Sequence, residues 1–232
     1  MQIEELSKEL LSNMVSGREN DNLEAKVKKI ELIDLISELS NDDKRKAFWI
    51  NIYNAYNILF LKMKPKLLES QKSRHQLYSK RNIIIGGHEL SLNDIKHGML
   101  RHSKIWWAKG YLSKFFISKF EKKFRVNIPD CRIHFVLNCG GLPCPPVGLY
   151  EGDKINQQLE LATKAYLDSE VTYYAEENLV SISQIFNWYT GDFGGSAGIL
   201  KLLKKYKKIP QDSTPVIIYK PYKWMPNIEN FS

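Results

Sequence analysis

Residues 40–65 read SNDDKRKAFWINIYNAYNILFLKMKP and carry the clearest helical pattern of the 232-residue chain. Asn41 or Asp42 can cap the first turn, acidic residues follow directly, and Pro65 ends the segment. Large apolar side chains recur at the spacing of one helix face. The segment therefore predicts a long helix with one side in the hydrophobic core.

Asparagines Asn51, Asn54 and Asn57 interrupt the other face of this helix at i, i+3 and i+6. Asparagine is a poor helix former, and a buried amide without a partner costs about 1–3 kcal/mol. Each amide is therefore expected to hydrogen-bond to a neighbouring element. Two interpretations stay open: the amides hold an irregular loop in place, or one of them lines a pocket.

The rest of the chain alternates short helical and extended patterns, which indicates an α+β fold. We expect a helical N-terminal half packed on a small mixed β-sheet, with a helical extension at 1–20 and a single domain at 21–232. The expected elements are helices at 2–15, 22–39, 91–101 and 153–168, hairpins at 82–90 and 171–182, a central strand at 131–139, two helices split by glycines within 181–208, and a last strand at 215–220.

Composition limits the classes of function. The chain has 43% hydrophobic residues and a net charge of +8, but its lysines are scattered over several segments, which is typical of solvated faces and does not predict nucleic-acid binding. The N-terminus lacks the basic start and apolar core of a signal peptide, and the longest apolar runs are too short and polar to span a bilayer. We expect a cytoplasmic protein without a membrane span.

The stretch RIHFVLNCGGLPCPP, residues 132–146, holds the chemistry-bearing side chains. His134 lies on the expected strand and Cys139 at its end, where site residues are commonly presented. Gly140 and Gly141 leave backbone amides open to a developing oxyanion. Cys144 precedes two prolines, and a helix starting there would favour its thiolate. The pattern predicts a thiol acyl-transfer site, and the alternative is a pair of buried or turn cysteines.

A zinc site would use Cys139, Cys144 and His134, with His97 or His102 as the fourth ligand. The C-x4-C spacing has no matching second pair, so we expect neither a metal nor another cofactor. A disulfide between the two cysteines would be transient under cytosolic redox conditions.

Three further residues are candidates outside that stretch. His97 and Arg101 are four residues apart on one expected helix and could hold an anionic group together. Asp192 lies in YTGDFGG, but the other protein-kinase motifs are absent from the sequence. We expect Asp192 to cap the following helix or to orient a histidine, as the acid of a catalytic triad does.

Five motifs together resemble, in order, those of the family catalogued as domain of unknown function 547, over about residues 20–228. They are AFWINIYNAYN, SLNDIKHGMLR, RIHFVLNCGGLPCPP, FNWYTGDFGG and YKPYKWMPN. Members of that family occur as bacterial single-domain proteins and as plant proteins behind leucine-zipper-like regions, and no activity comes with the name. The resemblance implies family-typical residues at Trp49, Asn51, Tyr53, Asn54, His97, Arg101, His134, Cys139, Pro145, Trp188 and Asp192.

The resemblance favours Cys139 over Cys144 as the nucleophile, because the first cysteine is the firmer position of the family pattern. Lys223 stands where the family's late motif has an acid, and Pro226 where it has a leucine. If that acid orients a site, its role is lost here or passes to Asp192. Many bacterial members look exported, in contrast to the location expected for this chain.

Two main hypotheses follow. In the first, the protein is a cysteine-dependent hydrolase or acyl transferase with Cys139 as nucleophile, His134 or His97 as base, Asp192 or Asn54 as orienting group, and the amides of Gly140 and Gly141 as oxyanion donors. In the second, the same pocket binds a peptide or small molecule without catalysis, through Asn51, Tyr53, Asn54, Arg101 and Trp188. A zinc-stabilised domain is the third alternative.

Overall fold

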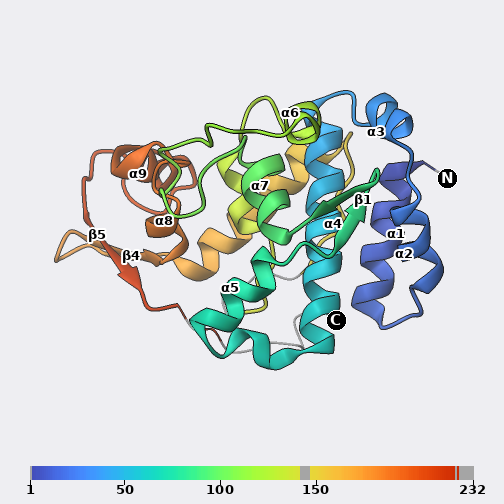
Figure 1. Cartoon of the computed structure of the whole chain (residues 1–232). Coiled ribbons are helices and arrows are strands. Elements are labelled where there is room, and N and C mark those ends of the chain that lie inside the picture. Colours follow the sequence, from blue (N-terminus) through green and yellow to red (C-terminus); the bar gives the residue numbers. More distant parts are fainter. Residues whose placement is uncertain (1, 142–146, 223, 225–232) are drawn as a thin grey trace.

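The computed structural model describes residues 2–141, 147–222 and 224. A long helix, α4 (Asp42–Met63), runs through the middle of the molecule, with α1 (Ile3–Ser16) and α2 (Asp21–Lys28) along one side (Figure 1). A three-stranded sheet with two short helices lies at the opposite end (Figure 1). The fold is α+β, as the sequence predicts.

Helix α4 begins where its sequence predicts, because the side chain of Asn41 accepts a hydrogen bond from the amide of Lys44 at 3.0 Å. Every residue from Lys46 to Ile58 is buried. The expectation of a single core-facing stripe was therefore too narrow, since the neighbouring elements enclose the helix on all sides. Helix α1 contributes to this enclosure, and Lys62 Nζ donates to the carbonyl of Met14 at 2.6 Å.

Short elements complete the helical body. The hairpin predicted at 82–90 is confirmed, with β1 (Ile83–Ile85) antiparallel to β2 (His88–Leu90). The helix predicted from Ser91 is a π-helix, η2 (Asp94–Leu100), in which the amide of Arg101 donates to the carbonyl of Lys96, five residues earlier. The other elements are α3 (Leu32–Glu38), the 3₁₀-helix η1 (Pro65–Leu68), α5 (Gln71–Ser79) and α6 (Lys119–Phe124).

The sheet combines both kinds of pairing. The predicted hairpin forms β3 (Thr172–Tyr174) and β4 (Leu179–Ser183), and the predicted last strand forms β5 (Val216–Lys220). β4 pairs antiparallel with β3 and parallel with β5. Parallel neighbours need a crossover, which α8 (Ile185–Trp188) and α9 (Gly195–Lys205) supply. Helix α7 (Ile155–Glu170) leads from the helical body into the sheet.

The strand predicted at 131–139 is wrong, because this segment begins with a 3₁₀-helix, η3 (Cys131–Phe135). The carboxylate of Asp130 accepts from the backbone amide of Arg132 at 3.0 Å and pairs with its guanidinium at 2.7 Å, which turns the chain at once. Beyond η3, side-chain amides from α4 bond to the backbone in place of a neighbouring strand. The β-forming composition of the segment is overridden by these contacts.

Two hydrophobic clusters meet at η3. Ile133 belongs to the cluster around α1 and α4, whereas Phe135 belongs to the cluster between α7, α9 and the sheet. His134 is therefore held between the two cores. No described helix has the length and apolar character needed to cross a bilayer.

Candidate functional site

The side chain of Asp192 is the centre of a buried polar network. It lies in the turn between α8 and α9, and its Oδ2 accepts hydrogen bonds from Arg101 Nε at 2.5 Å and from His134 Nε2 at 2.7 Å. A second bond joins Arg101 Nη2 to Asp192 Oδ1 at 3.1 Å. Three segments that are distant in sequence therefore meet at one carboxylate, and they contain four of the predicted site residues.

The fourth of these residues, His97, is joined to the network through Arg101. Arg101 Nη1 lies 2.5 Å from His97 Nδ1. Because a guanidinium can only donate, Nδ1 accepts and the imidazole carries its proton on Nε2. Burial, and then the positive charge of Arg101, lower the pKa of His97 well below 6.5. His97 and Arg101 lie together as predicted, but the anionic group that Arg101 holds is the carboxylate of Asp192 of the same chain.

The hydrogen bonds also fix the tautomer of His134. Burial would raise the pKa of Asp192, but hydrogen bonds from His134 and Arg101 outweigh it and lower the pKa to about 2. The carboxylate is therefore ionised, and His134 Nε2 donates to it. Burial lowers the pKa of His134 to about 4, against the opposing effect of Asp192. His134 is a neutral imidazole at pH 7.

The other ring nitrogen of His134 is exceptional. Nδ1 is buried and has no hydrogen-bond partner among the described residues. An imidazole with one nitrogen bonded to a carboxylate and a free lone pair on the other has the form of an oriented general base. Buried polar atoms without partners are rare enough that each calls for an explanation.

The ring of Tyr189 covers this network. It is stacked on the His134 ring, with centroids 4.0 Å apart and planes inclined by 13°. The Arg101 guanidinium lies 4.6 Å from the centroid of the same ring, and Lys96 Nζ lies 4.7 Å from it. Tyr189 is not among the residues predicted from the sequence, although it follows Trp188 in the motif FNWYTGDFGG.

A cleft runs past Asp192. Two adjoining cavities of about 450 Å³ and 150 Å³ share the residues Pro129, Asp130, Cys131 and Asp192. The larger is also lined by Asp42, Asp43 and Lys46, and the smaller by Arg101 and Lys104. The walls of the larger cavity therefore carry four carboxylates and one lysine.

The cysteine of this cleft is Cys131, which is not among the site residues predicted from the sequence. Burial, and then the negative charge of Asp130, raise the pKa of its thiol to about 11. Cys131 and His134 are three residues apart on a 3₁₀-helix, where such side chains lie on one face. Neither histidine of the network has a hydrogen bond to a sulfur among the described residues.

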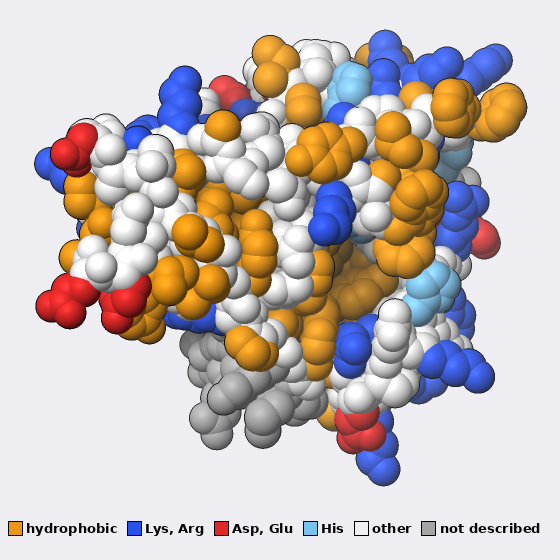
Figure 2. Space-filling model, turned by 90° about the vertical axis from the view of Figure 1, so that its left-hand side faces the viewer, with side chains coloured by type: hydrophobic (Ala, Val, Ile, Leu, Met, Phe, Trp, Pro, Cys, Tyr) orange, Lys and Arg blue, Asp and Glu red, His pale blue; other side chains and the backbone are white. Residues whose placement is uncertain are grey.

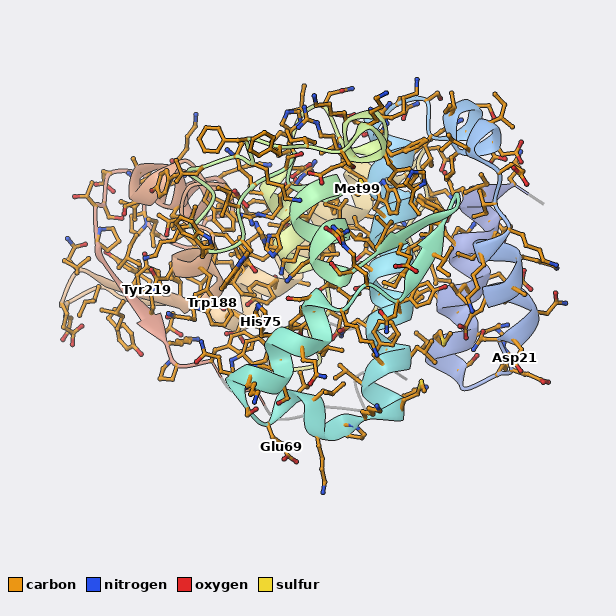
Figure 3. The ribbon with its side chains drawn as sticks, in the orientation of Figure 1. Asp21, Glu69, His75, Met99, Trp188 and Tyr219 are labelled. Atoms are coloured by element: carbon orange, nitrogen blue, oxygen red, sulfur yellow. The ribbon has the colours of Figure 1, made fainter. Side chains whose placement is uncertain are left out.

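Cys139 lies in a separate cluster of aromatic side chains. Its Sγ is 2.6 Å from the hydroxyl of Tyr222, and its carbonyl accepts from the hydroxyl of Tyr78 at 3.1 Å. Trp188 packs on Tyr222 with ring centroids 4.9 Å apart, and Trp224 stacks on Trp188 at 5.8 Å. Trp188 lies near the sheet end of the molecule, away from Asp21 on α2 (Figure 3). Among the residues that the structure describes, no hydrogen bond joins Cys139 to His134.

The amides of α4 hold the segment after η3 in place. Asn54 donates to the carbonyl of Val136 at 3.0 Å and accepts from the amide of Asn138 at 2.9 Å. Asn51 makes the same pair of bonds to the backbone of Tyr150, at 2.9 and 3.0 Å. Both asparagines are fully buried, and Tyr53 is 1% exposed. Of the two interpretations given above, the first describes Asn51 and Asn54.

The amide of Gly140, one of the two predicted oxyanion donors, already has an acceptor. The amide of Gly140 donates to Asn138 Oδ1 at 2.7 Å, so its hydrogen is already bonded, and Gly141 is buried. Gly140 has φ of 77°, and a Cβ there would lie 2.4 Å from Leu61. Its glycine is therefore explained by packing. Cys144 and Pro145 lie outside the described residues.

The described residues contain no group of three or more histidine, cysteine, aspartate or glutamate side chains that could hold a metal ion. The described candidates of the predicted zinc set have other partners. His134 bonds to Asp192 and Cys139 to Tyr222, while His97 bonds to Arg101 and His102 to the carbonyl of Val126.

Comparison with known proteins places the chain in a family. No curated protein and no solved structure matches it. A family model described as "Protein of unknown function, DUF547" matches residues 36–167, which is more than half of the chain and includes α4, η2 and η3. The protein therefore belongs to the DUF547 family of proteins of unknown function.

Proposed function

We propose that this domain binds a small molecule or peptide that carries a positively charged amine, in the cleft beside Asp192. The observation that carries the proposal is that Asp192, held by Arg101 and His134, forms part of the wall of both cavities. A carboxylate fixed by two partners from other elements is preorganised, which reduces the entropic cost of binding.

The charges of the cleft support the choice of ligand. Asp42, Asp43, Asp130 and Asp192 line the larger cavity together with Lys46. Each of these carboxylates is also paired with a basic side chain of the protein: Arg45, Lys46, Arg132 and Arg101, in that order. Carboxylates outnumber basic side chains in the wall of the larger cavity, and an excess of one sign of charge attracts ligands of the opposite sign. A volume of about 450 Å³ is large enough for a short peptide end or a small amine.

The test is a titration with putrescine and with lysine amide, followed by NMR at the backbone amides of residues 130–133, with the acetylated compounds as uncharged controls. Asp43→Asn removes one carboxylate from the cavity and should weaken binding about fivefold, since one screened charge contact is worth about 1 kcal/mol. Asp212→Asn, an exposed change elsewhere, should have no effect. Equal binding of the acetylated compounds would reject the proposal.

Thiol-dependent hydrolysis or acyl transfer is the second candidate. One specific observation favours it: His134 is neutral, oriented by Asp192, and has a buried Nδ1 without a partner among the described residues. In that reaction Nδ1 would take the proton of a cysteine thiol while the sulfur attacks a carbonyl carbon. The imidazolium would return the proton to the leaving amine or alcohol as its bond to that carbon breaks, and water or another acceptor would then release the acyl group from the thioester. Cys139 stays the proposed nucleophile. Its sulfur would first have to break its hydrogen bond with the hydroxyl of Tyr222.

This candidate is tested by the rate of iodoacetamide labelling of Cys139 as a function of pH. A catalytic thiol paired with His134 should have a depressed pKa that returns to an ordinary value near 8.5 in His134→Gln. Identical profiles for the two proteins would exclude the pairing and leave amine binding as the function to pursue.

A further inference from the structure

Residues 105–117, which we call the aromatic loop, expose large apolar side chains. Phe115 and Phe116 are 93% and 97% exposed, and Trp106, Trp107, Tyr111 and Leu112 are between 52% and 62% exposed. Monomeric proteins expose single apolar residues routinely, but a contiguous group of this size marks an interaction surface. The loop crosses the top of the molecule between α6 and the α8/α9 end (Figure 1).

Backbone hydrogen bonds hold the aromatic loop in this conformation. The amide of Ile105 donates to the carbonyl of Leu112 at 2.9 Å, and the amide of Lys114 donates to the carbonyl of Ser103 at 2.8 Å. The carbonyl of Lys109 accepts from Gly191, the residue before Asp192, at 2.7 Å. The loop is therefore attached to the body at both its base and its tip. Its aromatic side chains are exposed although its backbone is held by hydrogen bonds.

Positive charge surrounds these side chains. Residues 104–119 contain four lysines and no acidic residue. Lys119, Lys122 and Lys123 on the adjoining helix α6 are exposed, and none of them has an ion pair among the described residues. Hydrophobic, lysine and arginine side chains lie side by side on the face shown in Figure 2.

From this pairing of apolar and basic side chains we infer that the aromatic loop docks the protein on a membrane surface that contains anionic phospholipids. Phe115, Phe116 and Leu112 would enter the boundary of the acyl chains, and the tryptophans and Tyr111 would lie at the level of the headgroups, where amphipathic rings are favoured. The lysines of α6 would face the anionic headgroups. The attachment is peripheral, since no described helix can span a bilayer.

The positive charge and the apolar side chains of the loop favour anionic lipid over two other partners, a second copy of the chain and single-stranded nucleic acid. A second copy of the chain would bring the same basic surface to the interface, where like charges repel. Single-stranded nucleic acid would use the lysines and the aromatic rings, but the exposed side chain of Leu112 has no ring to stack on a base. Anionic lipid satisfies both the apolar and the basic parts of the loop.

Flotation with vesicles tests the inference. The full chain should float with vesicles of phosphatidylcholine mixed with phosphatidylserine and only weakly with phosphatidylcholine alone. Binding should weaken as salt is raised. The double variant Phe115→Ser/Phe116→Ser should lose at least tenfold in partitioning, whereas Ile33→Ser/Leu161→Ser, which changes two exposed apolar residues elsewhere, should bind as the parent protein does.

Charge variants separate the electrostatic part. Lys122→Glu should reduce partitioning by fivefold or more, since each lysine near an anionic surface contributes about 1 kcal/mol, and Lys201→Glu on α9 should change it less. Circular dichroism confirms that each variant is folded. Equal binding to both kinds of vesicle would overturn the inference, and so would retained binding of the phenylalanine double variant. Absence of vesicle binding would also overturn it, and dimerisation or binding of oligouridylate would then identify the true occupant of the loop.

Discussion

His134 Nε2 and Asp192 Oδ2 are 2.7 Å apart, although the two residues are 58 positions apart in the sequence. The bond connects η3, where the two hydrophobic clusters meet, to the turn between α8 and α9. It fixes the tautomer of His134 and favours the ionised form of Asp192.

Replacing Asp192 with Asn should destabilise the protein by about 3 kcal/mol. The substitution removes the charge that compensates Arg101, which is 1% exposed, and an unpaired buried charge is costly. Urea unfolding measures the effect, and Asp212→Asn, at an exposed position, is the control. A loss below about 0.5 kcal/mol, the level of an ordinary surface change, would show that Arg101 finds another partner.

Stability should fall as the pH is lowered from 6.5 toward 4. The pKa of His134 in the folded protein is about 4, below its ordinary value of 6.5, so the unfolded chain binds more protons in this interval. The shift of His97 acts in the same direction. Each of these histidines lowers the free energy of unfolding by up to about 1.4 kcal/mol for each pH unit by which the pH falls in this interval.

The urea midpoint measured across this pH interval tests that contribution. His134→Gln should reduce the slope of stability against pH, whereas His75→Gln, at an exposed position, should leave it unchanged. Parallel curves for the parent protein and His134→Gln would contradict the assignment of His134 as a buried neutral imidazole.

Replacing Asn54 with Ala should cost more stability than replacing Asn57. Asn54 makes two hydrogen bonds to the backbone after η3, whereas Asn57 makes one, to the carbonyl of Asn138, and its Oδ1 has no partner among the described residues. Removing Asn54 leaves a buried donor and a buried acceptor unpaired, at about 1–3 kcal/mol each. Chemical denaturation of the two variants gives the comparison, and equal losses would count against the pinning role of Asn54.

Gly110→Ala should disturb the Asp192 network. Gly110 has φ of 91°, and a Cβ there would lie 2.2 Å from Asp192 Oδ1 and 2.7 Å from its backbone nitrogen. Gly87 has φ of 74° but open space around it, so Gly87→Ala should cost only the strain of a left-handed residue, about 1 kcal/mol. The two thermal unfolding midpoints test this, and a Gly110→Ala loss no larger than that of Gly87→Ala would refute the clash.

Cys131 should react slowly with iodoacetamide at pH 7.5, because its pKa is raised to about 11 and only the thiolate reacts. Asp130→Asn removes the nearest negative charge and should accelerate labelling at a fixed pH. Mass spectrometry of the labelled peptide measures both rates. Fast labelling of the parent protein at pH 7.5 would instead indicate an activated thiol.

The sequence predicted the local features well where the determining contacts are local. Asn41 caps α4, Ser91 and Asp94 bond to each other at the start of η2, and Gly86 and Gly87 turn the first hairpin, all through neighbours a few residues away. The prediction failed at residues 131–139, where the pairing of Asp130 with Arg132 and the amides of α4 replace a strand.

The sequence by itself determined that α4 is a helix and that its asparagines need partners. It also placed His97, Arg101, His134 and Asp192 among a larger set of candidate site residues. Only the tertiary structure decided that these four form one network and that the sulfur of Cys139 lies against the hydroxyl of Tyr222. The physical reason for this difference is that helix capping and turn formation depend on backbone groups a few residues away, which the sequence shows directly. The partner of a buried side chain depends on which distant segments the two hydrophobic cores bring together.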